Sequence, residues 1–348
     1  MAGDSDHIVA ETAARIFADL ADPQTVNRSK DSAWKEPLWR ALEEAGLPLA
    51  WVREEVGGSG GSLPDGFAVL GAAGRYAASI PLAETLLAGW LLDRAGVACP
   101  AGAMSIAPTR PQERIRLQPD GRLSGHAVVP FAPEVRHIAV LAEGKVALVA
   151  RSACRMNEAR NLAGDASSLI DFTGVEPLHV AAADIDPERW LLMGAAVRAM
   201  QTAGALQTVL SMSVAYANER VAFERKIGKF QAVQQNLARL AGEAAAALAA
   251  AGSAADTLTH ANTSHDAVFL EAASAKIRCA EAAAEGSAIA HQVFGAIGFT
   301  QEHVLHRFTL RMLGWRDDFG NESWWAAELG RRVAKAGADE FWPLVASR

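Results

Sequence analysis

The sequence predicts a mainly α-helical protein with a small β domain inserted between two helical segments. Apolar residues recur at three- and four-residue spacing from about residue 7 to residue 97, short β-rich runs follow to about residue 185, and long helical segments resume at Pro187. With 348 residues, half of them hydrophobic, the chain is long enough for two or three domains with cores of their own. We therefore expect an N-terminal helical domain over residues 1–100, a β domain over 101–186 and a C-terminal helical bundle over 187–348.

The first helical segment contains clear helix ends. Apolar positions such as Ile16, Phe17 and Leu20 indicate one helix, and Gly46 ends a later one that includes Leu38. The polar run Gly57-Gly58-Ser59-Gly60-Gly61-Ser62 indicates a tight loop, and the next helix is expected to begin near Pro64. A flexible linker is the alternative interpretation of the glycine run.

The later elements are predicted from the change in periodicity. Strands are expected at 123–131, 137–142, 145–150 and 169–173, each bounded by Gly, Pro, Asp or Ser. Helices are expected at 189–221, 230–251, 265–293, 302–316 and 322–336. Several of these helices are long enough to pack as an antiparallel bundle.

Composition argues against several classes of partner. The net charge of -7 disfavours nucleic acid and anionic membrane surfaces, and no apolar run approaches the roughly 20 residues of a membrane span. The N-terminus lacks the layout of a signal peptide, so we expect a cytoplasmic protein. Cys99, Cys154 and Cys279 are isolated, and neither they nor the nine histidines form a metal-binding pattern, so no metal site is expected.

Two blocks in the C-terminal half carry a family resemblance. Residues 217–234, ANERVAFERKIGKFQAVQ, resemble the acyl-CoA dehydrogenase stretch ERxxFGRxIGxFQAVQ, and residues 291–303, HQVFGAIGFTQEH, are similar to that family's QxxGGxGFTxE segment. The stretch from Leu38 to Gly61 and the turn Leu123-Ser124-Gly125 are also similar to family patterns, so the likeness covers nearly the whole chain. The resemblance implies a middle β-barrel, FAD as cofactor and α,β-oxidation of an acyl-CoA thioester, in fatty acid or steroid catabolism. It also implies an electron-transfer flavoprotein or similar acceptor.

The two blocks contain the groups that a dinucleotide cofactor requires. Two phosphate charges call for a fixed guanidinium and for glycines that allow close approach of the main chain, and Arg220 and the pair Gly295/Gly298 supply these. The resemblance implies that Arg220 pairs with the FAD pyrophosphate, and that Phe223, Gln231 and the segment Gln292 to Gly298 approach a FAD held largely by a neighbouring subunit. A homo-oligomer or a heterotetramer with a related subunit follows. A surface ion pair between Arg220 and Glu224 is the alternative.

The departures from the family pattern are concentrated in the catalytic parts. Glu224 stands where the family has glycine, and the acidic flavin loop of the β domain is replaced by Ser105-Ile106-Ala107-Pro108-Thr109. Phe319 occupies the place of the usual catalytic glutamate, and the alternative position used by some members aligns near Gly194. Asp318, one residue away, is the candidate base, and an ion-paired acid beside Arg316 is its alternative interpretation.

These features support two functional hypotheses. The first, which is the function that the sequence favours, is a FAD-dependent acyl-CoA dehydrogenase with a non-standard base, acting on an unusual or bulky acyl-CoA thioester. The second is a catalytically silent subunit of a heteromeric acyl-CoA dehydrogenase that completes the FAD site of an intact partner. Other chemistry on a CoA thioester is a third possibility. The second hypothesis explains why the cofactor-contact blocks are retained while the flavin loop and the base are lost.

Overall fold

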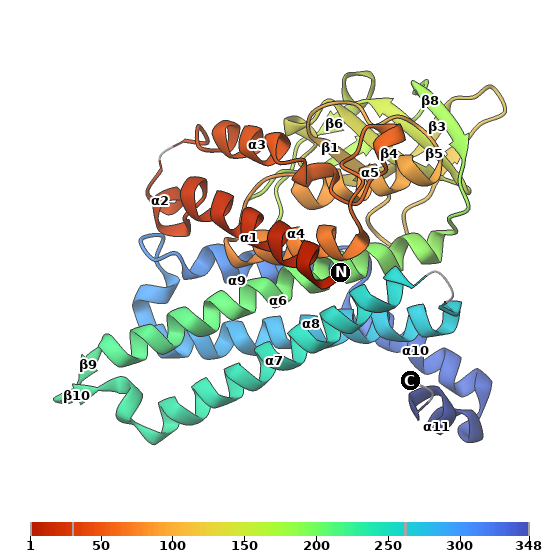
Figure 1. The fold of residues 1–348 in the computed structure, drawn as a ribbon. Helices are drawn as coiled ribbons and strands as arrows, with labels where there is room; N and C mark the ends of the chain where they lie inside the picture. The colour runs from red at the N-terminus through yellow and green to blue at the C-terminus, as the bar shows by residue number, and fades with distance from the viewer. Residues whose placement is uncertain (1, 30, 261–262, 347–348) are drawn as a thin grey trace.

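The computed structural model describes residues 2–29, 31–260 and 263–346, and it contains helical, β and helical segments in that order (Figure 1). The N-terminal segment consists of α1 (Ala2–Leu20), α2 (Pro23–Arg28), α3 (Lys35–Glu44), α4 (Leu63–Arg75) and α5 (Leu82–Arg94). Short 3₁₀ turns, Leu47–Leu49 and Glu54–Val56, lie between α3 and α4. The expected mainly helical class with small sheets is confirmed.

The start of α4 is fixed by its sequence. Ser62 is the N-cap, its hydroxyl accepts from the backbone N–H of Asp65, and the Asp65 carboxylate accepts from the backbone N–H of Ser62 in return. Pro64 fits the first turn because its missing N–H has no partner there. The glycine run before it is packed rather than open, since a Cβ at Gly58 would overlap the backbone of Val52.

The middle segment consists of two four-stranded sheets packed face to face. One has the order β1-β4-β5-β8, from β1 (Met104–Ala107), β4 (His137–Ala142), β5 (Lys145–Ala150) and β8 (His179–Ala182). The other has the order β2-β3-β7-β6, from β2 (Ile115–Leu117), β3 (Leu123–Pro130), β7 (Ser167–Asp171) and β6 (Arg155–Asn157). β1 pairs parallel with β4, and the remaining pairings are antiparallel. Buried residues of both sheets, among them Ile138, Val149, Val129 and Ile170, form their shared core.

The C-terminal segment is dominated by three long helices. These are α6 (Pro187–Glu219), α7 (Gln231–Thr259) and α8 (His265–Phe294), followed by α9 (Leu305–Trp315), α10 (Glu322–Ala336) and α11 (Ala338–Ala346). In Figure 1, α6, α7 and α8 run side by side, and α11 projects away from the body near the C-terminus. α4 packs directly on α6 because both lack side chains at the crossing: a Cβ at Gly204 would overlap the carbonyl of Gly71.

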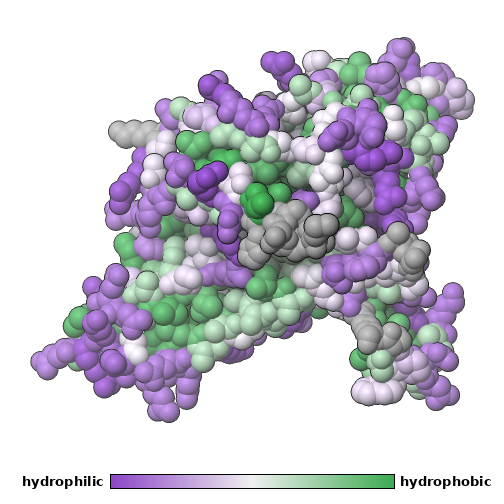
Figure 2. All heavy atoms as spheres, viewed as in Figure 1, coloured by the Kyte–Doolittle hydropathy of each residue, from purple (hydrophilic) through white to green (hydrophobic). Residues whose placement is uncertain are grey.

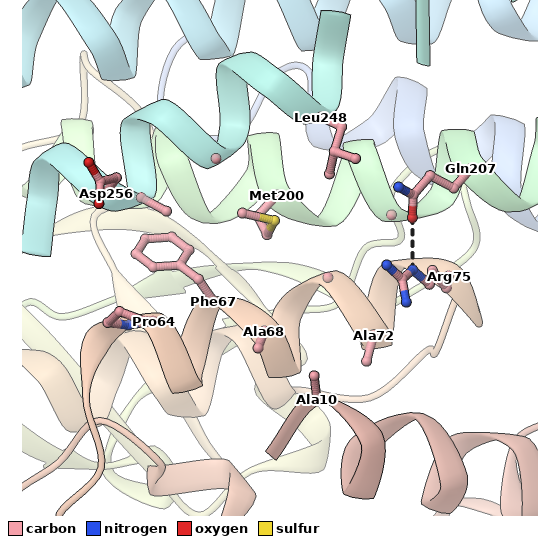
Figure 3. A pocket seen from close by; sticks show the side chains of 14 residues that line it. Ala10, Pro64, Phe67, Ala68, Ala72, Arg75, Met200, Gln207, Leu248 and Asp256 are labelled. Atoms are coloured by element: carbon pink, nitrogen blue, oxygen red, sulfur yellow. Dashed lines mark hydrogen bonds between the residues drawn. The ribbon is translucent and has the colours of Figure 1, made fainter. Parts of the chain in front are cut away.

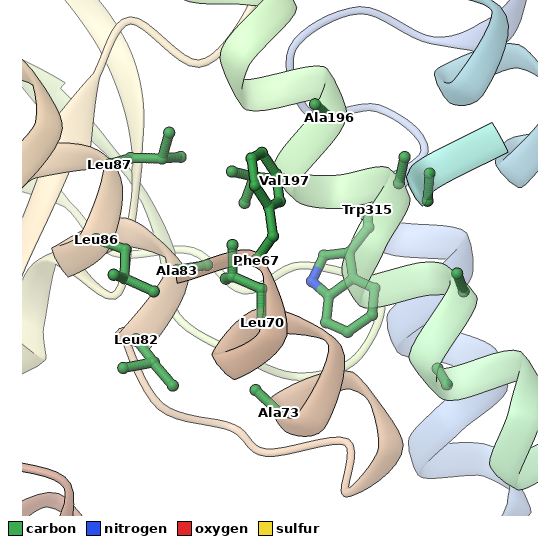
Figure 4. Packing of buried hydrophobic residues seen from close by; sticks show 14 of the residues in the cluster. Phe67, Leu70, Ala73, Leu82, Ala83, Leu86, Leu87, Ala196, Val197 and Trp315 are labelled. Atoms are coloured by element: carbon green, nitrogen blue, oxygen red, sulfur yellow. The ribbon is translucent and has the colours of Figure 1, made fainter. Parts of the chain in front are cut away.

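One large hydrophobic core joins the N-terminal helices to the bundle. Figure 4 shows part of it, with Phe67 and Leu70 of α4, Leu86 of α5, Val197 of α6 and Trp315 of α9 directed toward one another. The core also includes residues on one face of the first sheet, such as Ile106 and Leu148. Among the described residues, no helix is long and apolar enough to cross a membrane.

Candidate functional site

The first cofactor-contact block forms a hairpin at one end of the bundle. α6 ends at Glu219, Arg220 caps it, and β9 (Val221–Ala222) pairs antiparallel with β10 (Arg225–Lys226). The two turn residues, Phe223 and Glu224, both have positive φ, 52° and 62°. This is the backbone of a primed two-residue turn, in which each non-glycine residue is strained by roughly 1–3 kcal/mol. The turn leaves the Phe223 side chain 88% exposed.

The Arg220 guanidinium is exposed and available to a ligand. Its backbone is fully used, since its N–H donates to Tyr216 (2.8 Å) and its carbonyl accepts from Ile227 (2.9 Å). Within the part of the chain that the structure describes, no ion pair joins Arg220 to Glu224. Arg225 does not neutralise Glu224 either, because its guanidinium lies over the ring of Phe230, 4.0 Å from the centroid. The tip therefore presents a guanidinium and an aromatic ring to solvent.

The second block lies at the same end of the bundle. The 3₁₀ turn η6 (Gly295–Phe299) follows α8, with Gln292 and Gly295 exposed and Gly298 buried. Gly295 has φ 64°, a backbone conformation that favours glycine, and a Cβ at Gly298 would lie only 2.9 Å from Cβ of Phe294. Both positions therefore disfavour a larger residue. The ring of Tyr216 on α6 stacks on Phe294 with centroids 4.4 Å apart. This contact joins the end of α6, which carries Arg220, to the end of α8.

Gln231 completes the set as the first residue of α7, and it is exposed. The structure therefore places Arg220, Phe223 and Gln231 around one hairpin. It places Gln292 at the end of α8, and Gly295 and Gly298 on the turn that follows. Figure 2 shows hydrophilic side chains gathered at the hairpin tip, at the lower left, and hydrophobic residues on the bundle beside it. Such a tip can contact a ligand held by another molecule.

The position of the usual base is filled by an aromatic ring. Phe319 lies between α9 and α10 with φ 57°, is 0% exposed, and meets the Trp190 ring edge-on with centroids 5.6 Å apart. Its backbone N–H donates to the carbonyl of Thr109 at 2.6 Å. A Cβ added to Gly194 would overlap the Phe319 ring. The two positions at which a base was considered therefore face each other, and the Phe319 side chain occupies the space between them.

Asp318 is held in an ion pair. Its Oδ2 accepts from Nε of Arg198 at 2.9 Å, and Arg198 also donates to Glu84 (2.6 Å) and to Gln201 (2.7 Å). The side chain of Asp318 is 23% exposed, while that of Arg198 is 4% exposed. Burial raises the pKa of Glu84, although the Arg198 charge opposes this shift. One oxygen of the Asp318 carboxylate is therefore already engaged by a buried guanidinium.

The interpretation of Asp318 as an ion-paired acid is confirmed, but the sequence did not indicate its partner. Arg316 pairs with Glu322, whereas the partner of Asp318 is Arg198 from the middle of α6. Close by, Lys276 of α8 donates from Nζ to the carbonyl of Trp315 at 2.6 Å, and burial lowers its pKa to about 8. The available signal was a single arginine inside the apolar run LLMGAAVRAMQTAGAL, since an isolated buried charge requires partners.

The loop that replaces the family's flavin loop has its polar groups occupied internally. Ser105 donates from Oγ to the carbonyl of Pro130, and Thr109 donates from Oγ1 to the carbonyl of Val128 at 2.9 Å. The backbone N–H of Thr109 donates to Glu113 at 2.9 Å. These residues do not fit a flavin ring bound by this chain, because their donors are already paired. The exposed groups at the hairpin tip do fit contacts to a FAD.

A cavity of about 400 Å³ lies elsewhere, between α1, α4, α6 and α7 (Figure 3). Phe67, Met200 and Leu248 line it, and Arg75 donates to Gln207 at 2.8 Å at one end. None of the predicted site residues lines it. Within residues 2–29, 31–260 and 263–346, no cluster of His, Cys, Asp or Glu is arranged to hold a metal ion.

Comparisons with known proteins agree with this architecture. Residues 4–98 match the family described as the acyl-CoA dehydrogenase N-terminal domain, and residues 180–321 match its C-terminal domain. The chain is 30% identical over 315 residues to the acyl-CoA dehydrogenase IpdE2 of Mycobacterium tuberculosis, covering 88% of this chain and 90% of that protein.

Solved structures share the fold over nearly the whole length. The Tcur3481-Tcur3483 steroid ACAD G363A variant is 25% identical with a TM-score of 0.85, covering 97% of this chain and 99% of that one. A chain of the ChsE4-ChsE5 complex from Mycobacterium tuberculosis is 22% identical with a TM-score of 0.85, covering 96% and 98%. PigA, solved as an FAD complex, is 19% identical with a TM-score of 0.77, covering 96% and 98%.

Proposed function

Because this chain belongs to the acyl-CoA dehydrogenase family, we propose that it is the catalytically silent subunit of a heteromeric acyl-CoA dehydrogenase, in which it completes the FAD site of a related partner. The matches to the family and to its solved structures confirm the family, the fold and the oxidoreductase class that the sequence predicts. The observation that carries the proposal is the seating of the Phe319 ring against Gly194, with no acid at either position.

The chemistry of the family reaction explains why this observation matters. Oxidation between the α- and β-carbons of a thioester requires a carboxylate that takes the α-proton. Phe319 cannot accept a proton, and its ring takes up space beside Gly194. Asp318, the candidate base, has its carboxylate turned to Arg198 at 2.9 Å. The first hypothesis, a self-sufficient enzyme with Asp318 as base, therefore has no support from this geometry.

The hairpin tip supplies the positive part of the proposed role. Arg220 is an exposed guanidinium on a short rigid hairpin, and a charge-assisted hydrogen bond to a pyrophosphate would contribute roughly 1.5–3 kcal/mol. Phe223 is nearly fully exposed, and removing its apolar surface from water by contact with a cofactor or partner would be favourable. Gln231 and Gln292 would add hydrogen bonds from the two sides.

The remaining parts of the assignment follow from the relatives. The ChsE4-ChsE5 complex among the structural neighbours favours a related subunit as partner. The steroid ACAD among them favours a bulky, steroid-derived acyl-CoA thioester as substrate. Electrons would leave through an electron-transfer flavoprotein or similar acceptor. Cys99, Cys154 and Cys279 are all free thiols, which suits the reducing cytoplasm that we propose as its location.

The experiment compares the chain alone with the chain mixed with a related subunit that has both a flavin loop and a base glutamate. We expect the isolated chain to be colourless after dialysis and inactive, and the mixture to form a larger particle by light scattering that retains FAD and oxidises the thioester. An isolated chain that purifies yellow and turns over a CoA thioester would show that the proposal is wrong.

A matched pair of variants tests the tip. Arg220→Ala should lower the FAD content of the mixed complex about tenfold or more at limiting FAD, because the lost contact is worth roughly 1.5–3 kcal/mol. Arg331→Ala removes another exposed arginine, which pairs with Glu328 on α10, and should leave FAD content unchanged. Equal flavin content in both variants would remove Arg220 from the cofactor site.

A further inference from the structure

Glu113 concentrates hydrogen bonds from two separate backbone segments. Its Oε2 accepts from the N–H groups of Thr109 (2.9 Å) and Arg110 (3.1 Å), and its Oε1 accepts from that of Val128 on β3 (2.8 Å). Burial raises the pKa of this carboxyl group, although the three N–H groups and the Arg110 charge oppose the shift. A half-buried carboxylate that accepts three main-chain N–H groups links those segments.

The segment held by Glu113 in turn holds the rings of the closed site. The carbonyl of Pro108 accepts from the indole Nε1 of Trp190 at 2.7 Å, and the carbonyl of Thr109 accepts from the backbone N–H of Phe319 at 2.6 Å. Trp190 and Phe319 meet edge-on. A continuous path of hydrogen bonds therefore runs from β3 through Glu113 and Thr109 to Phe319.

Packing alone does not fix this segment. A cavity of about 160 Å³ lies on one side of it, lined by Pro108, Arg110, Pro111 and Glu113 among others. A second cavity, of about 270 Å³, is lined by Arg110 and Pro111 together with Gly320. Since Arg110 and Pro111 line both cavities, this end of the segment has room on either side, and the contact from the Arg110 N–H to Glu113 holds it in place. Thr109 is buried, and its hydroxyl adds a second tie to β3 by donating to the carbonyl of Val128 at 2.9 Å.

We propose that Glu113 is a positioning residue that acts as a latch, holding residues 108–110 so that they keep Phe319 seated against Gly194. This inference rests on the proposed function, because a seated Phe319 is what closes the site in a silent subunit. In the unlatched state, residues 108–110 move and the Phe319 N–H loses the Thr109 carbonyl as its acceptor.

Hydrogen exchange measured by mass spectrometry on the full chain tests the latch. In Glu113→Ala, exchange should accelerate at least tenfold in the peptides that contain Thr109, Val128 and Phe319, while β4, with Ile138, stays protected. Glu113→Gln retains one side-chain oxygen that can take the Thr109 and Arg110 N–H groups, so it should free Val128 and largely preserve Phe319. Glu176→Gln, an exposed carboxylate of the same domain, is the control and should change nothing.

Two outcomes would overturn the latch. Unchanged exchange at Phe319 in Glu113→Ala is one, and acceleration spread evenly over the β strands is the other, because it would indicate a general structural role. If the alanine variant does not fold, hydrogen exchange of the wild-type chain in low denaturant provides the test instead. The amides of Thr109, Val128 and Phe319 should then exchange with one common opening free energy, which is lower than that of Ile138. Different opening free energies for Thr109 and Phe319 would refute the coupling. Flavin content plays no part in this test, so the latch and the silent-subunit proposal can fail separately.

Discussion

A double-mutant cycle on Gly194 and Phe319 tests directly whether the aromatic ring fills the space between the two base positions. Phe319→Ala removes a completely buried ring and should lower the free energy of unfolding by about 4 kcal/mol, through lost transfer energy and the cavity left behind. Gly194→Ala places a methyl group inside the Phe319 ring, which overpacks the site. We expect a cost of about 2 kcal/mol after the gain of roughly 1 kcal/mol in helix propensity.

The double variant shows whether the two positions are in direct contact or affect stability independently. With the ring absent, the methyl group introduced by Gly194→Ala enters the space that Phe319 vacated, so the overlap disappears and part of the cavity is filled. The double variant should therefore lose only about 3–4 kcal/mol, against roughly 6 if the effects were additive. The coupling of about 2–3 kcal/mol is the quantity that the structure predicts.

Urea unfolding followed by tryptophan fluorescence measures all of the variants. Gly242→Ala is the matched control, because a Cβ at this glycine of α7 meets nothing within 4 Å and should stabilise the chain by up to about 1 kcal/mol. Additive losses within about 0.5 kcal/mol would mean that the Phe319 ring does not lie against Gly194, and the argument for a closed site would lose its basis.

Two further predictions concern the buried charges. Asp318→Asn should leave turnover of the mixed complex unchanged and lower the free energy of unfolding by about 1–2 kcal/mol, because one charged hydrogen bond to Arg198 is lost while that of Glu84 remains; lost turnover at unchanged stability would identify Asp318 as a base. Burial lowers the pKa of Lys276 from 10.5 to about 8, so the folded chain binds fewer protons than the unfolded chain between these values, and stability should rise as pH increases from about 8 to 10.5. Lys276→Met should remove this rise in pH-dependent urea titrations, and an unchanged slope would contradict the assignment.

Helices and buried strands were predictable because their periodicity is local. The expected helix 322–336 coincides with α10, and the expected strands 137–142 and 145–150 coincide with β4 and β5. β1 and β2 were not expected, since they are only four and three residues long, which is too short for a pattern to be recognised. The terminal helix α11 was also missed because Pro343 lies inside it.

The candidate site was only partly predictable, for a physical reason. The hairpin block is contiguous in sequence, so chain connectivity alone keeps its residues close together in space. The closed site is built from Gly194, Phe319 and Thr109, which lie on three different segments and meet only after folding. Arg198 and Asp318 are likewise far apart in sequence, so the apolar run around Arg198 indicates a buried guanidinium but not which carboxylate will pair with it.

The position of the retained and lost features supports a division of labour between subunits. Arg220 and Phe223 are exposed, so neither side chain is needed to pack the core of this chain. Core packing therefore does not explain the hairpin that presents them. The interior where a base would act is instead filled by the buried Phe319 ring, and the nearby acids Glu84 and Asp318 are paired with Arg198. A chain under selection for its own catalysis would keep that space open. A chain that serves a partner's cofactor would close its interior and keep its tip, and this is the arrangement that the structure has.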